Sequence, residues 1–388
     1  MTFAPAGIGS SRRGSPEREA ELVVSLVASG LVRTRGWRGV SERERPYDRT
    51  LQLGLDRLAA VCAVAGVPAP RGVSDLVWDW SATRPLNKWP LAFEADAQVG
   101  GELLLIGGEP SEFCLEWSIE ALDVVAEVHE STLVSQVKTG AEQAGRSDLY
   151  AEWRRFVTSH AVVDPREFLE AKNRFLAVPQ WATWLDESYE PIPPTSTGAG
   201  QIAVCGHCDQ WMVPARGSGW LCESPRCLRA VHLPDPVLRP AVGAYRLRAE
   251  LVRFVALPGR PELALAKALA GRGARIVLYP GLDALDLVAR WPDGYAIGID
   301  VKDWHKPYLL ARKIKKFPAW PAGHPFCYDD AFVVIPADRI VRNRTYCNIV
   351  RRHSEALRAQ PHIKVLTDQA LIAKCPDTGQ AGEVVCGA

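Results

Sequence analysis

The pattern of apolar and polar positions divides the chain into a helical first half and a second half of alternating strands and helices. Apolar residues recur every three or four positions in residues 18–66 and again in 116–185, which is the spacing of amphipathic helices. Residues 67–115 are mixed and have no clear period. From about residue 244 the pattern predicts the order helix, strand, strand, strand, helix, strand, helix, strand, helix.

Glycine and proline bound the predicted elements of the second half. A helix over Pro261–Ala270 ends at Gly271 and Gly273, and Pro292-Asp293-Gly294 has the composition of a hairpin turn. The predicted strands are Arg275–Tyr279, Asp286–Trp291, Gly294–Lys302, Ala331–Ile335 and Ile363–Leu366. The remaining predicted helices are Pro307–Lys316, Ile340–Ala359 and Asp368–Ala373.

The strand ending at Lys302 has one apolar face and one face that ends in charge. Its apolar face consists of Tyr295, Ile297, Ile299 and Val301. Its other face consists of Ala296, Gly298, Asp300 and Lys302. Two small residues therefore lead to a carboxylate and an ammonium, and we expect the space beside them to admit a ligand. Upstream, Asp286 begins the neighbouring strand, and Asp283 competes with it as the first acid of this pair.

Length and composition favour several domains. A chain of 388 residues is too long for one ordinary core, and residues 191–200 have the Pro, Thr, Ser and Gly content of a linker. The start is polar and lacks the apolar region of a signal peptide. The prediction is a disordered segment (1–20), a mainly helical domain (21–190), the linker (191–200), a cysteine module (201–235) and an α/β domain (241–388).

Charge is unevenly distributed along the chain. Residues 241–388 contain 22 Lys and Arg against 14 Asp and Glu, a net +8, whereas residues 1–240 contain 24 against 31, a net −7. The C-terminal part is therefore the better candidate for binding a polyanion. No apolar stretch approaches the length of a membrane span. Together with the missing export signal, this makes the cytoplasm the expected location, with no membrane partner.

Four of the ten cysteines form a metal-binding pattern. Cys205-Gly206-His207-Cys208 and Cys222-Glu223-Ser224-Pro225-Arg226-Cys227 supply four thiolates, the number that closes a tetrahedral zinc site. So short a segment cannot bury enough apolar area to fold alone, and zinc would supply the folding free energy. We expect a structural zinc ribbon with Cys205, Cys208, Cys222 and Cys227 as ligands. His207 and His232 are possible substitute ligands, and Arg216, Arg226 and Arg229 permit contact with nucleic acid.

The two acids and Lys302 are the groups that phosphodiester cleavage requires. Carboxylates on neighbouring strands, Asp286 and Asp300, can hold Mg²⁺ or Mn²⁺. Lys302, two residues after Asp300, would orient the attacking water and balance charge. Glu262, in the predicted first turn of the preceding helix, could reach the same metal, although the helix dipole alone favours an acid there. A strand-end ion pair between Asp300 and Lys302 in an unrelated domain is the alternative.

These residues resemble the PD-(D/E)xK, or restriction-endonuclease-like, superfamily of nucleases. Glu262, Asp286, Asp300 and Lys302 match its helix-borne Glu, its first acid and its (D/E)xK triplet in order, and the elements up to residue 373 continue the pattern. Leu285 stands where the pattern has proline, and the literal Pro292-Asp293 lies in the predicted turn, too close to Asp300. The resemblance implies an α-β-β-β-α-β core and a metal-dependent nuclease, with Glu262, Asp286 and Asp300 as metal ligands.

The layout of the whole chain adds a narrower resemblance. A helical front, a four-cysteine ribbon and the segments Tyr279–Leu287 and Ile299–Asp303 resemble the restriction-endonuclease-like proteins that accompany prokaryotic PIWI-module proteins and helicases. That resemblance implies defence against foreign DNA, with those proteins as partners. Basic residues after the triplet are expected to contact a nucleic-acid backbone: Lys306, Arg312, Lys313, Lys315 and Lys316.

The competing hypothesis is a catalytically silent protein that binds nucleic acid or serves as a scaffold through its zinc ribbon. The sequence leaves open the choice between DNA and RNA, between single and double strands, and between endonuclease and exonuclease, although DNA is the expected substrate. It also assigns no role to residues 1–190.

Overall fold

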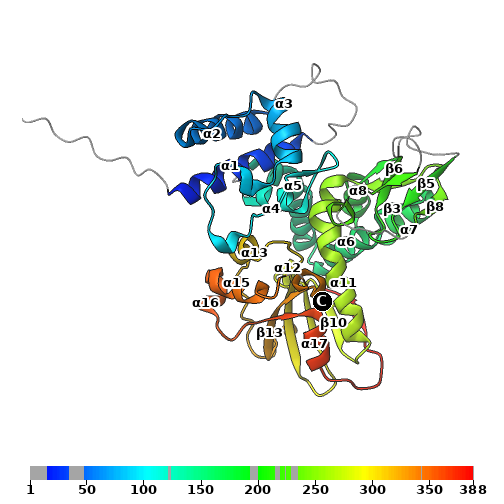
Figure 1. Cartoon of the computed structure of the whole chain (residues 1–388). Coiled ribbons are helices and arrows are strands. Elements are labelled where there is room, and N and C mark those ends of the chain that lie inside the picture. Colours follow the sequence, from blue (N-terminus) through cyan, green and yellow to red (C-terminus); the bar gives the residue numbers. More distant parts are fainter. Residues whose placement is uncertain are drawn as a thin grey trace, which may run out of the picture. The chain divides into compact units, whose positions relative to one another are not determined.

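The computed structural model describes residues 15–34, 48–120, 124–192, 200–214, 219–222, 224–228, 235–341 and 343–387. The first fourteen residues of the predicted disordered start, linker residues 193–199, and Arg216, Arg229 and His232 lie outside the described residues. The chain divides into two compact units, Met1–Leu122 and Asp123–Ala388 (Figure 1). The domain boundaries inferred from the sequence stay predictions. None of the helices described is long and apolar enough to cross a membrane.

The first unit is mainly helical. Helix α1 begins at Pro16, where the Ser15 side chain accepts a hydrogen bond from the Arg18 amide. Residues 16–20, which the sequence analysis placed in a disordered start, are therefore helical. Apolar faces of α1 and α2 supply much of the core, and α1 also packs on α4. The elements are α1 (Pro16–Arg33), α2 (Arg49–Ala65), α3 (Val73–Asp75), a π-helical turn (Leu76–Ser81), 3-10 turns (Leu86–Lys88, Ala95–Ala97), β1 (Leu105–Ile106), β2 (Glu109–Pro110) and α4 (Glu112–Glu120).

The second unit opens with four further helices, as the helical spacing of residues 116–185 predicts. Asp164 caps α7 with a capping box to Glu167, which fixes its start at Pro165. A small antiparallel sheet of order β3-β9-β4 follows the helices. The elements are α5 (Val124–Gln143), α6 (Ser147–Ser159), β3 (Val162–Val163), α7 (Pro165–Asn173), α8 (Pro179–Ser188), β4 (Tyr189–Pro191) and β9 (Tyr245–Leu247).

The cysteine module is a four-stranded antiparallel sheet of order β7-β6-β5-β8 with one short helix. Its first cysteine pair lies in the turn between β5 and β6, where the Cys205 amide donates to the Gln210 carbonyl at 2.8 Å. Its second pair follows β7 and continues into α9. The elements are β5 (Gln201–Val204), β6 (Trp211–Pro214), β7 (Trp220–Leu221), α9 (Pro225–Leu228) and β8 (Val237–Pro240).

A mixed six-stranded sheet of order β14-β13-β12-β11-β10-β15 forms the centre of the C-terminal part (Figure 1). Strands β10, β11 and β12 are antiparallel, with Val288 opposite Gly298. Strands β13 and β14 continue parallel to β12, and β15, which the sequence analysis did not predict, pairs parallel with β10. The strands are β10 (Arg275–Leu278), β11 (Leu287–Arg290), β12 (Ala296–Val301), β13 (Asp330–Ile335), β14 (Lys364–Thr367) and β15 (Val384–Cys386).

The helices of this part keep the predicted order but differ in their bounds. Pro261 lies inside α11 rather than in its first turn, because the helix continues from a π-helical turn and has Pro258 near its start. Helix α13 ends at Lys313, where the extended Ile314 buries its side chain in the core. The bounds are α10 (Ala249–Leu251), the π-helical turn (Val252–Ala256), α11 (Leu257–Ala270), α12 (Pro280–Asp283), α13 (Pro307–Lys313) and α17 (Asp368–Lys374).

The single helix predicted over Ile340–Ala359 is wrong; the chain forms three short helices there. They are α14 (Ala337–Ile340), α15 (Tyr346–His353) and α16 (Glu355–Ala359). The Asn343 side chain accepts hydrogen bonds from the Thr345 amide and hydroxyl, which stabilises a turn before α15. Ser354 then ends α15 and caps α16 by accepting from the Leu357 amide.

Both faces of the large sheet are covered. Ile297, Ile299 and Val301 pack in one cluster with residues of α6 and α11, so the apolar face predicted for β12 is confirmed. The opposite face packs, through residues such as Val333, on α13 and α15. The end of β12 therefore emerges from a sheet whose two faces are both covered by packed side chains.

Candidate active site and four-cysteine centre

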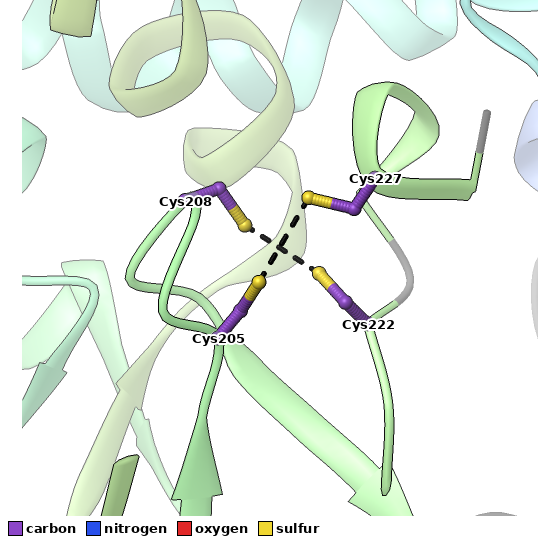
Figure 2. A group of neighbouring side chains, drawn as sticks. All are labelled: Cys205, Cys208, Cys222 and Cys227. Carbon is purple, nitrogen blue, oxygen red and sulfur yellow. Dashed lines mark hydrogen bonds between the residues drawn. The ribbon is translucent and has the colours of Figure 1, made fainter. Parts of the chain in front are cut away.

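The four predicted zinc ligands converge (Figure 2). All four cysteines are buried, and their sulfur atoms lie within 4.8 Å of one another. The Cys208 and Cys222 sulfurs are 3.4 Å apart, and the Cys205 and Cys227 sulfurs are 3.9 Å apart. A tetrahedral site with Zn–S bonds of about 2.3 Å has sulfur–sulfur distances of about 3.8 Å. The residues present therefore fit a four-thiolate zinc centre, which we call the four-cysteine centre.

The surroundings of this centre favour a closed site. The His207 ring Nδ1 lies 3.3 Å from the Cys227 sulfur, so His207 is a neighbour of the sulfur cluster rather than a replacement for a cysteine. Hydrogen bonding with Cys205 raises the pKa of Cys222. Four thiols packed this closely ionise together only when a cation compensates their charge. Within the described part of the chain, no other group of three or more His, Cys, Asp or Glu side chains is arranged to hold a metal in this way.

Three of the predicted active-site residues are in direct contact at the end of β12. Lys302 Nζ lies 3.7 Å from Asp286 Oδ2 and forms an ion pair with Asp300. The same Asp286 oxygen accepts a hydrogen bond from the Val301 amide at 2.6 Å. Asp286 precedes β11, and its amide donates to the Ile299 carbonyl, so hairpin pairing fixes its position. We call Glu262, Asp286, Asp300 and Lys302 the acid–lysine site.

Glu262 joins this group through an arginine that the sequence analysis missed. Arg154 Nη2, on α6, donates to the two Glu262 carboxylate oxygens at 2.8 and 3.1 Å and lies 3.8 Å from Asp286 Oδ1. The guanidinium also forms an ion pair with Asp283 and lies 4.3 Å from the centroid of the Tyr279 ring. Carboxylates and cations therefore alternate, with Arg154 between Glu262 and Asp286 and Lys302 between Asp286 and Asp300.

Close packing of α6 on α11 puts Arg154 beside Glu262. Gly259 of α11 lies against Thr158 of α6, and a Cβ at Gly259 would come within 2.7 Å of the Thr158 hydroxyl oxygen. About one turn before Thr158 on α6 and one turn after Gly259 on α11, Arg154 meets Glu262. Only a glycine permits this approach, and the approach brings a cation from the N-terminal half to the site.

A signal for Arg154 exists in the sequence. Tyr150, Arg154 and Thr158 are spaced by four residues, so they share one face of α6. Tyr150 and Thr158 are almost fully buried, which makes this the inward face. An arginine on the inward face of a helix needs a buried acidic partner. The neighbouring Arg155 is more exposed and pairs with Glu152.

Burial and charge perturb the acids of the site. Burial raises the pKa of Glu262 to about 7, against the opposing effect of Arg154. Burial, and next the charge of Glu262, raise the pKa of Asp286 well above its usual range. Burial lowers the pKa of Lys302, but Asp286 and Asp300 more than compensate and hold it above its usual value, so the ammonium stays charged. The buried acids would therefore be stabilised by additional positive charge.

Asp283 belongs to the same network through Arg154 and also pairs with Lys138. It accepts a hydrogen bond from the Tyr150 hydroxyl at 3.0 Å and lies 3.5 Å from Lys138 Nζ. Its backbone is left-handed, with φ of 77°, as are those of Tyr279 and Leu282 nearby. Such strain in non-glycine residues is typical of functional loops. Asp286 contacts Lys302, and its role as the first acid of the site stays a prediction.

The space beside the small residues of β12 is filled. A Cβ at Gly298 would come within 2.7 Å of the Tyr328 ring and 2.9 Å of the Leu285 side chain. The expectation that Ala296 and Gly298 admit a ligand is therefore wrong. Their small size serves the packing of the core on the sheet face covered by α13 and α15, because Tyr328 and Leu285 occupy the volume that a larger side chain would need.

The predicted basic contacts differ in exposure. Lys306 is buried, with a relative exposure of 7%, and precedes α13. Arg312, Lys315 and Lys316 are exposed, and Lys313 is half-buried. Because α13 ends at Lys313, the last two lysines follow the helix instead of extending it. Only the exposed residues are accessible to a nucleic-acid backbone.

The donor set of the acid–lysine site fits a divalent cation. Mg²⁺ and Mn²⁺ take oxygen ligands, and Glu262, Asp286 and Asp300 offer carboxylates around one lysine. The raised pKa values of Glu262 and Asp286 have burial as their main cause, and a bound cation would offset it. The carboxylates are not gathered as tightly as the cysteine sulfurs, because Arg154 and Lys302 lie between them.

Two family models match separate parts of the chain. The model described as pPIWI_RE three-gene island domain Y matches residues 23–164, and the model described as REase associating with pPIWI_RE matches residues 259–382. Searches of curated proteins and of solved structures found no match. The first matched segment contains Arg154 and the second contains the whole acid–lysine site, so the charges that meet there come from both segments.

These matches confirm the resemblance seen in the sequence. A restriction endonuclease matched over residues 259–382 fits the PD-(D/E)xK type, while the assignment of Glu262, Asp286, Asp300 and Lys302 to its motif stays a prediction. Residues 23–164 are thus similar to domain Y of the pPIWI_RE three-gene island, and residues 259–382 are similar to the restriction endonuclease that associates with pPIWI_RE.

Proposed function

We propose that this chain is a nuclease that uses Mg²⁺ or Mn²⁺ to hydrolyse phosphodiester bonds in DNA. The observation that supports this most strongly is the contact of Lys302 with Asp286 and Asp300 at the end of β12. This cluster lies within the segment that matches a restriction-endonuclease family. A chance ion pair between Asp300 and Lys302 would not require the second acid, its hydrogen bond from the Val301 amide, or the nearby Glu262.

Each residue of the site has a role that follows from its position. Glu262, Asp286 and Asp300 would hold the divalent cation, which when bound polarises the scissile phosphate and lowers the pKa of a water. The Val301 amide holds the Asp286 carboxylate in one orientation, so that group is preorganised. Lys302 stays protonated, and its Nζ can orient the attacking water or neutralise charge that develops on the phosphate.

The exposed basic residues after the site provide contacts to the backbone of the substrate. We assign this role to Arg312, Lys315 and Lys316, which are exposed on and after α13. Phosphate contacts of this kind position a nucleic acid without reading its sequence. DNA is the substrate expected for a restriction-endonuclease-like domain in a defence island.

The four-cysteine centre is proposed as a structural zinc site. Four cysteine ligands leave no coordination position for water or substrate, so this zinc would stabilise the module and take no part in hydrolysis. Two metals would then serve two purposes in one chain, with zinc for folding and Mg²⁺ or Mn²⁺ for the chemistry.

The biological role proposed is defence against foreign DNA. Both matched models carry the pPIWI_RE name, and one of them is the domain Y of a three-gene island. We infer that a PIWI-module protein is one partner of this chain and a helicase is another, as the layout of the sequence implies.

Incubation of the purified protein with supercoiled plasmid, single-stranded DNA or RNA, each with Mg²⁺ or Mn²⁺, tests the proposal. We expect metal-dependent cleavage of DNA that is lost in Asp300→Ala and Lys302→Ala. Lys302→Ala should reduce the cleavage rate much more than the affinity for DNA. Cleavage that survives both substitutions would remove the acid–lysine site as the catalytic centre, and cleavage of RNA alone would change the substrate.

One observation favours a second function, a catalytically silent protein that binds nucleic acid. The Arg154 guanidinium lies within hydrogen-bond reach of Glu262 and near Asp286, where a metal would need oxygen ligands. Calorimetric titration with Mn²⁺ separates the two functions. Binding that disappears in Asp286→Asn supports the nuclease, whereas no binding in the presence of DNA supports the silent protein.

A further inference from the structure

We propose that the four-cysteine module positions the acid–lysine site, with Arg260 and Arg226 as its two positioning residues. The inference extends the proposed nuclease function and rests on it. Arg260, close to Glu262, bonds to the turn of the first cysteine pair. Arg226, beside the second pair, bonds to Asp303, which follows Lys302. The module therefore contacts the chain next to the site at two points.

The first cysteine pair holds the start of α11. Arg260 Nη1 donates to the Cys208 carbonyl at 2.6 Å and to the Asp209 carboxylate at 2.8 Å. Its Nη2 donates to the His207 carbonyl at 3.3 Å. Arg260 stands two residues before Glu262 on the same helix. These contacts reach the backbone of the cysteine turn itself, so the shape of that turn determines where α11 begins.

Apolar packing supports the same junction. Leu257, the first residue of α11, packs against the cluster formed by the four cysteines, Ala203 and Met212. The start of α11 is therefore held to the module by side-chain packing and by the three hydrogen bonds of Arg260. A movement of the cysteine turn would move Glu262 with it, because a helix transmits displacement along its axis.

The second cysteine pair holds the segment after β12. Arg226 directly precedes Cys227, and its Nη1 donates to Asp303 Oδ2 at 3.0 Å. Asp303 follows Lys302 directly, and its carboxylate is buried, with 7% of the side chain exposed. Arg226 also pairs with Asp338. The other oxygen of Asp303 accepts from Arg339, which belongs to the nuclease-like part of the chain. One carboxylate beside the catalytic lysine thus has one partner from the module and one from its own domain.

Zinc would couple the two contacts. The carbonyls of His207 and Cys208 and the side chain of Arg226 lie within one residue of a cysteine ligand, or belong to it. Their positions are therefore set by how the four sulfurs are held. Without a metal, nothing joins the two cysteine turns at the four sulfurs, and a module this small has little other core. Loss of zinc should then release Glu262 and Lys302 together.

Hydrogen exchange of the full-length protein, with and without zinc, tests this inference without requiring activity. Peptides covering 257–262 and 300–303 should exchange about tenfold faster after zinc is removed under reducing conditions, the range of an ordinary coupling between sites. A peptide within α1 should be unchanged. Unchanged exchange at 257–262 and 300–303 in the zinc-free protein would overturn the proposal.

Two matched substitutions, each removing one arginine partner of the Asp303 carboxylate, sharpen the test. Arg226→Met should accelerate exchange at 300–303 in the zinc-loaded protein, and zinc removal should then add little there. Arg339→Met removes the other partner of Asp303, and zinc removal should still have its full effect. Arg226→Lys should restore part of the protection. Equal and additive effects of zinc removal in the Arg226 and Arg339 variants would contradict the coupling.

Cleavage kinetics provide the functional readout. Arg226→Met and Arg260→Met should lower kcat about tenfold, with KM within about twofold, because they disturb the geometry of the site and not the surface that binds DNA. A change confined to KM would place both arginines in substrate binding and overturn their positioning role. If the wild-type protein cleaves no nucleic acid, the proposed nuclease function fails, while hydrogen exchange still decides whether the module positions the acid–lysine site.

Discussion

The four-cysteine centre and the acid–lysine site are assembled in opposite ways. The four cysteines come from two short turns of one module and lie sulfur to sulfur. The acid–lysine site draws on a helix, a hairpin and, through Arg154, a second helix more than a hundred residues earlier in the chain. In the proposed function, zinc holds the ligands of the first site together. The second already has two cations among its carboxylates and is held by the folded sheet.

If both sites bind the proposed metals, the first folds together with its metal, whereas the second is already folded before its metal binds. The strands around Lys302 are buried on both faces, so the acids keep their places through packing and backbone hydrogen bonds. The cysteine module has a core of few residues besides the cysteines themselves. Removing zinc should therefore unfold the module, whereas removing Mg²⁺ should leave the acid–lysine site folded but inactive.

The largest expected effect comes from breaking the four-cysteine centre. Cys222→Ser should abolish zinc binding and cost roughly 10 kcal/mol of metal-binding free energy, because a closed site loses one of its four ligands. Zinc content and the fluorescence of Trp220, which packs against the cysteines, would measure the loss. Cys347→Ser, outside the cluster, is the control and should retain zinc. Stoichiometric zinc in the Cys222 variant would contradict the four-ligand site.

The second effect in size concerns chemistry without unfolding. Asp300→Asn keeps the shape of the side chain but removes the charge that pairs with Lys302. We expect cleavage to slow about a thousandfold, ~4 kcal/mol in the barrier, with zinc content and thermal stability near wild type. Asp293→Asn, in the turn that carries the literal Pro-Asp pair, should cleave normally, since Asp293 only accepts a hydrogen bond from the Tyr295 amide. Equal losses of cleavage in both variants would indicate that Asp293, in the turn, is the first acid of the site.

The same contrast explains what the sequence could predict. The cysteine spacing names all four ligands, because they are close in the chain and their chemistry has few other uses. The alternation of β12 places Asp300 and Lys302 together, and the hairpin composition of 292–294 puts Asp286 on the paired strand. These inferences depend on local periods, and the structure shows the contacts that they imply.

What escaped prediction depends on packing between distant segments. Arg154 reaches Glu262 only because α6 and α11 approach closely at Gly259, and no local pattern states which helices pack together. Gly298 looked like room for a ligand, yet Tyr328 from a later loop fills the space. The division of 340–359 into three helices depends on side-chain hydrogen bonds of Asn343 and Ser354 that compete with a helical period.

The third expected effect tests the contribution of α6 to the acid–lysine site. Arg154→Met retains the apolar stem but leaves Glu262, Asp283 and Asp286 without their shared cation. The free energy of unfolding should fall by about 3 kcal/mol, since a buried ion pair loses one partner. Arg155→Met, on the same helix but more exposed, should change it by less than about 0.5 kcal/mol. Urea unfolding of the zinc-loaded protein without added Mg²⁺ or Mn²⁺ measures both free energies, and equal effects of the two substitutions would contradict the buried role of Arg154.

The loss in Arg154→Met should depend on pH. In the wild type the pKa of Glu262 is raised to about 7, so the folded state holds this proton more tightly than the unfolded state does. Stability therefore falls as pH rises from the ordinary Glu pKa towards 7. Without Arg154 the pKa of Glu262 rises further, and the fall continues to higher pH. The deficit of the variant should thus be smaller near about pH 5 than near about pH 8, and a pH-independent deficit would place the contribution of Arg154 in packing alone.

The smallest expected effect comes from Tyr150→Phe, which should lower stability slightly and leave cleavage almost unchanged. Tyr150→Phe removes the hydroxyl that donates to Asp283 at 3.0 Å, while Arg154 and Lys138 still face that carboxylate. The free energy of unfolding should fall by about 1.5 kcal/mol, the lower end for one hydrogen bond to a charged group. Tyr295→Phe, whose hydroxyl bonds to the partly exposed Asp330, is the matched control and should cost less. Cleavage by Tyr150→Phe should stay within about threefold of wild type, because the hydroxyl touches Asp283 and not Lys302. A loss of orders of magnitude in cleavage would make Asp283, rather than Asp286, the first acid of the site.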